Sequence, residues 1–167
     1  MNKIQSLLDK MWTDYTTLNP QAQRIVNLME GLGDEVENDH IALRTFSHPK
    51  VGLDVVAKPF LEAGYEHKGD YEFIEKKLRA KHYEHSDPKL PLIFISELLL
   101  DKFSDSFNTI VNSLVDQVSS EQISDFNFSE LPSVIYLHFI PSLKLSCCSF
   151  FVLSLCFSTK SNNSLFD

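Results

Sequence analysis

The 167-residue chain is poor in the residues that mark several large classes of protein. It has only three cysteines, all near the C-terminus, so we expect neither an even disulfide framework nor a Cys-x-x-Cys metal pair. Its 15 lysines and arginines are outnumbered by 23 aspartates and glutamates, giving a formal net charge of -8, and they form no basic run. The sequence therefore argues against nucleic acid or an anionic membrane surface as a partner.

Several motifs are also missing. There is no glycine-rich phosphate loop, no Gly-x-Ser-x-Gly elbow and no internal repeat. The N-terminal stretch MNKIQSLLDKMWTDY carries Asp9 and Asp14 within its apolar periodicity and has no small-residue cleavage site, which is not the pattern of a signal peptide. We therefore expect a cytoplasmic protein whose cysteines stay reduced.

The amino-acid composition of the chain changes near Leu131. Residues 1–131 mix charged and apolar residues evenly, whereas residues 132–167 are crowded with Ser, Phe and Cys and carry three charged residues, Lys144, Lys160 and Asp167. We interpret residues 1–131 as a folded domain and residues 132–167 as a tail of unclear origin.

Two explanations of this tail stay open. Its cleanest apolar run, Leu145 to Phe157, could anchor the chain in a membrane, but it is about 13 residues long where a span needs roughly 20. A shifted reading frame or an alternative exon would explain both the abrupt change and the lack of regular periodicity, and we favour it over the anchor.

The first 33 residues predict two helices. Apolar residues recur at helical spacing over residues 3–17, namely Ile4, Leu7, Leu8, Met11 and Tyr15. Asn19 followed by Pro20 is typical of a helix start, and Gly31 and Gly33 are typical of its end. Both helices precede the segment that holds the candidate site.

Residues 39–46 alternate in the manner of a strand. His40, Ala42, Arg44 and Phe46 should share one face, because side chains on a strand have period 2. His40 and Arg44 would then lie about 13 Å apart along the strand. An arginine fork pairs bidentately with a carboxylate, so the two residues could serve one pocket if a ligand several atoms long lay between them.

The rest of the domain predicts an α+β fold. GLDVVAKPFLEAG, residues 52–64, reads as a helix interrupted at Pro59 and closed by Gly64. Short strands follow, including a hairpin over residues 78–98, and a closing helix follows from Asp101. With the strand at 39–46, this gives a βαβββ-like module preceded by two helices.

Four segments carry a resemblance to a known family: NDHIALRTF, GLDVVAKPFLEAGY, EFIEKKLRAKHYEH and LPLIFISEL. Residues 1–128 resemble the N-terminal part of the 2-oxoadipate dioxygenase/decarboxylase family, whose fold is similar to one half of a vicinal oxygen chelate protein. The resemblance implies an Fe(II) enzyme that uses dioxygen to convert 2-oxoadipate, a small 2-oxo dicarboxylic acid, to 2-hydroxyglutarate with loss of CO2. It also implies a metal site of two histidines and one glutamate, with His40 as the first metal histidine and Arg44 as the residue that binds a substrate carboxylate.

The implied metal triad is incomplete in this sequence. Its other ligands belong to a second module in the family, no glutamate follows Glu130, and the surroundings of His138 do not match. The alternative is therefore an inactive truncated fragment or a binding module, with self-association through an exposed sheet face or the tail. No separate catalytic acid or base is assigned. His82 and His85 are interpreted as exposed residues on opposite faces, and Glu97 as a residue that supports the site.

Overall fold

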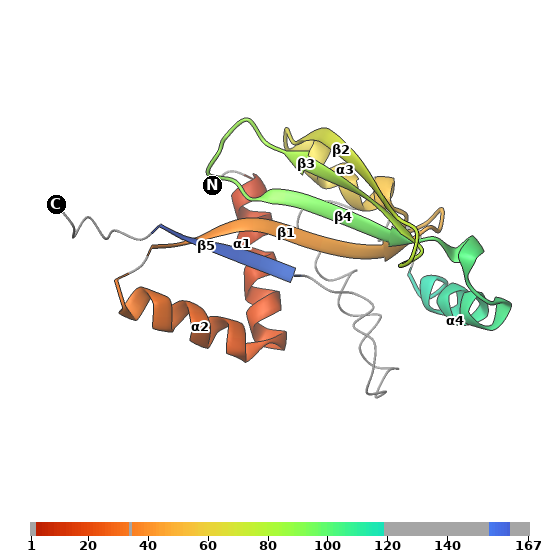
Figure 1. Ribbon diagram of the computed structural model, residues 1–167, viewed down its shortest axis with the longest axis horizontal. Helices are drawn as coiled ribbons and strands as arrows, with labels where there is room; N and C mark the ends of the chain where they lie inside the picture. Colours follow the sequence, from red (N-terminus) through yellow and green to blue (C-terminus); the bar gives the residue numbers. More distant parts are fainter. Residues whose placement is uncertain (1–2, 34, 119–153, 161–167) are drawn as a thin grey trace.

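The computed structural model describes residues 3–33, 35–118 and 154–160 (Figure 1). Two helices come first, and a strand, a helix and three further strands follow. The elements are α1 (Lys3–Leu18), α2 (Pro20–Gly31), β1 (Glu35–Phe46), α3 (Leu53–Glu62), β2 (Glu66–Phe73), β3 (Leu78–Glu84), β4 (Leu92–Leu98), the 3-10 turn η1 (Leu100–Lys102), α4 (Asp105–Val115) and β5 (Ser154–Lys160). The predicted βαβββ order and the α+β class are confirmed.

The strands form one sheet in the order β2-β3-β4-β1-β5. β1 and β4 are parallel, with Arg44 opposite Ser96 and Thr45 opposite Glu97. The β2-β3 and β3-β4 pairs are antiparallel, and the second of these is the predicted hairpin. β5, which the sequence did not predict, runs antiparallel to β1 along its outer edge, as Figure 1 shows. β1 is thus an inner strand, although its two neighbours come from distant parts of the chain.

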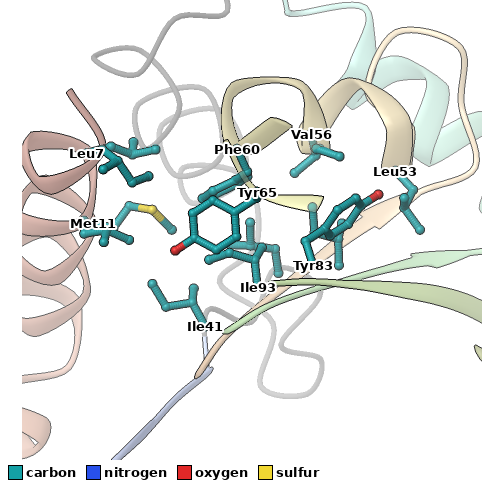
Figure 2. Close-up of a cluster of buried hydrophobic side chains, with 14 of the residues drawn as sticks. Leu7, Met11, Ile41, Leu53, Val56, Phe60, Tyr65, Tyr83 and Ile93 are labelled. Atoms are coloured by element: carbon teal, nitrogen blue, oxygen red, sulfur yellow. The ribbon is translucent and has the colours of Figure 1, made fainter. Parts of the chain in front are cut away.

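One face of the sheet is the main core. Ile41 and Leu43 of β1 lie beside Ile93 and Ile95 of β4, and all four are at most 2% exposed. α1 covers one part of this face with an apolar stripe at helical spacing, and α3 packs beside α1 against β4 and β1 (Figure 2). In Figure 2, Leu7 and Met11 reach toward Tyr65 and Ile41 from the α1 side. The apolar periodicity of residues 3–17 is therefore explained by burial.

The opposite face carries the even-numbered residues of β1 and is called the open face below. At the end where β1 and β4 finish, α4 packs against it (Figure 1). The contact consists of the buried residues Phe46, Leu78, Leu98, Val111 and Val115. Farther along, the open face is more accessible, since Tyr71 is 42% and Leu92 is 41% exposed. α4 thus leaves the part of the face that holds His40 more accessible than the part that holds Phe46.

α3 differs from its prediction in one respect. The sequence predicted an interruption at Pro59, but the helix runs through it from Leu53 to Glu62. Proline removes one intrahelical hydrogen bond, and here Val56, Ala57, Pro59 and Phe60 are all buried. Burial of this face stabilises the helix enough to offset the missing bond. Gly64 ends α3 as expected, with a φ of +98° that other residues rarely adopt.

The structure also bears on the tail. Within residues 3–33, 35–118 and 154–160, no helix combines the length and the apolar character that a membrane span needs. The run proposed as an anchor, Leu145 to Phe157, lies mostly outside the described residues. The boundary predicted near Leu131 also lies outside them.

Candidate functional site on the open sheet face

His40 and Arg44 lie on the open face of β1, with Ala42 between them. The alternation is visible in burial, because Ile41, Leu43 and Thr45 are at most 2% exposed while His40, Ala42 and Arg44 are half-buried. The structure therefore brings the two predicted residues to one face, at the strand spacing of about 13 Å that four residues give.

The imidazole of His40 is oriented by its neighbour in the chain. Nδ1 lies 2.9 Å from Oδ2 of Asp39, and the His40 side chain is 34% exposed. A carboxylate can only accept, so Nδ1 carries the proton in this bond and the lone pair of the neutral ring is on Nε2. A carboxylate on the other ring nitrogen is the usual arrangement of a histidine that binds a metal.

Arg44 is half-buried, and its guanidinium lies over β4. Nε donates to Oγ of Ser96 over 3.3 Å, and Ser96 is 3% exposed. Among the described side chains, no carboxylate forms an ion pair with Arg44. Arg79 provides a contrast, since its Nε lies 2.5 Å from Oε1 of Glu97. A half-buried guanidinium without a protein carboxylate can bind an anion from outside.

A second set of polar side chains lies on the open face around His82 of β3, two strands away from β1. The hydroxyl of Tyr71 is 3.0 Å from Nδ1 of His82, and Nε2 of His82 is 3.2 Å from Oε1 of Glu84. The expectation that His82 is a solvated surface residue is therefore wrong, because a ring neighbour and two polar partners leave its side chain 20% exposed. His85 is also half-buried, with its ring 5.2 Å from that of Tyr65.

Glu97 lies on the other face of the sheet. It pairs with Thr45, not with Arg44, and is 1% exposed. Its Oε2 accepts a hydrogen bond of 2.7 Å from the backbone N–H of Leu53 at the start of α3, and its Oε1 accepts from Arg79. The interpretation of Glu97 as a support for the His40 site is wrong. Its position one residue along from Ser96 directs it to the helix side.

The described residues do not form a complete metal site. In the parts of the chain that the structure describes, no three His, Cys, Asp or Glu side chains converge as a cation would need. An iron site with open positions for substrate and oxygen needs three protein ligands, and the open face offers His40 as a single well-oriented one. The described residues therefore supply one ligand of such a site and not the complete set of three.

The family model described as 2-oxoadipate dioxygenase/decarboxylase matches residues 2–127. The chain belongs to the 2-oxoadipate dioxygenase/decarboxylase family. This confirms the resemblance found on the four sequence segments, which lie entirely within the matched range. The family is one of dioxygenases, and members of such families commonly use a metal.

Two plant proteins show how much of a family member is present here. An Arabidopsis thaliana 2-oxoadipate dioxygenase/decarboxylase is 31% identical over 125 residues, which are 68% of this chain and 34% of the plant protein. A rice protein of the same name is 32% identical over 67% of this chain and 34% of its own length. The chain thus spans about a third of the length of the curated relatives it matches.

Solved structures agree on the fold. A protein from Shewanella frigidimarina described as a hydrolase is 45% identical, with a TM-score of 0.69 over 74% of this chain and 48% of that one. A rice hydroxyglutarate synthase in complex with 2-oxoadipate is 29% identical, with a TM-score of 0.69 over 78% of this chain and 45% of that one. A glyoxalase superfamily protein from Ralstonia eutropha, 19% identical with a TM-score of 0.58 over 79% of this chain and 48% of that one, supports the vicinal oxygen chelate-like fold alone.

The expected cytoplasmic location is contradicted by these family members. The names of the two plant relatives place them in the chloroplast, and in rice also in the amyloplast. The expectation depended on the absence of a secretory signal, and that criterion does not test for delivery to a plastid.

Sequence reasoning missed one residue of the site. Ser96 contacts Arg44 only because β1 and β4 pair in parallel across 52 residues of sequence. A serine at that point in LPLIFISEL interrupts an apolar run, which was the available signal. The sequence alone does not indicate which strand this serine would face.

Proposed function

We propose that this chain carries the N-terminal part of an oxygen-dependent 2-oxo acid decarboxylase site, in which Arg44 binds the far carboxylate of the substrate and His40 is one metal ligand. The proposal rests mainly on the burial and the hydrogen bonding of Arg44. It is half-buried on the open face, held at Nε and not paired with any described carboxylate. The preferred substrate is 2-oxoadipate, which is the ligand named for the rice relative.

The spacing along β1 supports a dicarboxylic substrate. A ligand that reaches from His40 to Arg44 must cover most of about 13 Å, less the reach of the two side chains. A six-carbon chain with a 2-oxo acid at one end and a carboxylate at the other suits this distance. Ala42, between the two residues, has a small side chain that leaves room for the carbon chain.

The metal is proposed to be Fe(II). When bound, iron would supply the site for oxygen chemistry and for the 2-oxo acid. On this chain His40 would hold it through Nε2, with Asp39 fixing the ring. The remaining ligands would come from outside the described residues. If none are supplied, the chain is the inactive fragment or binding module considered above. The boundary near residue 131 and self-association also stay predictions.

The carboxylate contact is tested by isothermal titration of the metal-free, full-length chain with two ligands. We expect Arg44→Gln to weaken binding of 2-oxoadipate about tenfold or more, as loss of a charge-assisted hydrogen bond would. It should leave binding of 2-oxohexanoate, which lacks the far carboxylate, unchanged. The matched control is Arg24→Gln, because Arg24 is an exposed arginine on α2. Equal loss for both ligands, or no loss for either, would refute the role of Arg44.

The metal contact is tested in the same protein by NMR under anaerobic conditions. Small additions of Mn²⁺ should broaden the His40 ring signals first, because a nearby paramagnetic ion relaxes them. His40→Ala should remove this preferential effect, whereas His67→Ala should not, since His67 is an exposed histidine on β2. Broadening of all histidines at the same concentration would show that His40 has no special affinity. Turnover of 2-oxoadipate with Fe(II) and oxygen then separates an active chain from a binding module.

A further inference from the structure

Ser96 is the one polar neighbour that the structure gives the guanidinium of Arg44 among the described residues. It lies on β4 directly opposite Arg44 and is 3% exposed. Most buried serines only satisfy their own hydroxyl through the backbone. Ser96 donates to a backbone carbonyl in this way and also accepts a hydrogen bond from the charged side chain of Arg44. It can therefore orient Arg44 as well as fill space in the sheet.

The direction of the hydrogen bonds is fixed. Oγ of Ser96 donates to the backbone carbonyl of Leu43 over 3.2 Å, which uses its single proton. Its lone pairs are therefore available to accept, and Nε of Arg44 donates to it over 3.3 Å. Leu43 is the residue before Arg44. The backbone of β1 therefore orients the Ser96 hydroxyl, and this hydroxyl in turn holds Arg44 of the same strand. Because Ser96 is buried, water does not compete for these positions.

This contact determines which edge of the guanidinium remains available. A guanidinium can hold a carboxylate through Nε and one Nη, or end-on through both Nη atoms. The bond to Ser96 uses the Nε–H, which leaves the end-on edge. We propose that Ser96 is a positioning residue that makes Arg44 present its two Nη groups, end-on, to the carboxylate of a dicarboxylic substrate. The proposal rests on the proposed function and specifies how the carboxylate is recognised.

The first test needs no ligand. In the full-length chain labelled with 15N, the Nε–H signal of Arg44 should be sharp and slow to exchange with water at neutral pH. Ser96→Ala should make it exchange rapidly, and Ser96→Thr, which keeps the hydroxyl, should restore the protection. The matched control is Thr45→Val, which removes a hydroxyl 1% exposed on the opposite face of β1. If the Arg44 signal is equally protected in wild type and Ser96→Ala, the proposal is wrong.

The second test measures binding of 2-oxoadipate and 2-oxohexanoate to the same variants. Ser96→Ala should weaken 2-oxoadipate binding about three- to tenfold, as loss of one neutral partner would, and leave 2-oxohexanoate unchanged. Thr45→Val should change neither affinity. Dispersed amide spectra would establish that every variant is folded.

The outcomes separate this proposal from the one on which it rests. If Arg44→Gln weakens 2-oxoadipate binding and Ser96→Ala does not, the carboxylate contact stands and the positioning role of Ser96 is refuted. If Arg44→Gln has no effect, the proposed function fails at Arg44 and the positioning role fails with it. Loss in both variants, with loss of Nε–H protection in Ser96→Ala, supports both.

Discussion

The buried carboxylate of Glu97 connects β4 to the start of α3, and replacing it tests how much this connection stabilises the fold. We expect Glu97→Ala to lower the free energy of unfolding by about 3–4 kcal/mol. About 1.5–3 kcal/mol comes from the hydrogen bond between the carboxylate and the N–H of Leu53, and the remainder from the space left in a packed core. Leu53 is 2% exposed, so its N–H has no water to replace the lost partner. Arg79, with its side chain 59% exposed, regains water and adds little.

Glu97→Gln separates the charge from the hydrogen bond. Its amide oxygen can still accept from Leu53, but the negative charge beside Arg79 and the start of α3 is lost. We expect a loss of about 1–2 kcal/mol, roughly half that of the alanine variant.

Urea unfolding monitored by circular dichroism measures both variants. A loss of 3–4 kcal/mol should move the midpoint by about 1–4 M. Glu72→Ala, which removes an exposed glutamate of β2, is the control and should change stability by less than about 0.5 kcal/mol. If Glu97→Ala unfolds at the same midpoint as Glu72→Ala, the carboxylate does not secure α3 to the sheet and the reasoning is wrong.

Two further predictions concern pH and backbone geometry. Burial, with smaller effects of Asp54, Asp70 and Glu97, raises the pKa of Tyr83 from 10.0 to about 12. Between these pH values the unfolded tyrosine loses its proton while the folded one keeps it, so stability should fall as pH rises, by up to about 1.4 kcal/mol per pH unit. Urea unfolding at pH 9 and 11 should show a smaller fall for Tyr83→Phe than for wild type, and parallel falls would contradict the assignment. Gly64→Ala should cost about 1–2 kcal/mol at its φ of +98°, where an added Cβ also lies 3.1 Å from Nε2 of His85. Gly31→Ala, with nothing within 4 Å of the added atom, should be neutral or slightly stabilising. Thermal melts measure both glycine variants, and equal melting temperatures would count against the strain at Gly64.

The sequence by itself determined most of the elements and the two faces of β1. Helical spacing of apolar residues located α1, alternation located β1, and turn residues located the β3-β4 hairpin, because these patterns express the geometry of a single segment. Alternation alone also placed His40 and Arg44 on one face. It did not predict β5, and it overstated the effect of Pro59, whose cost depends on what α3 buries.

Only the tertiary structure decided which residues meet across the sheet. The parallel pairing of β1 with β4 puts Ser96 beside Arg44 and turns Glu97, the next residue, toward α3. Both are polar residues near the end of one apolar segment, so local pattern gives them similar roles. The register between strands 52 residues apart assigns one to the candidate site and the other to the core, because a shift of one residue reverses the face on which every side chain lies.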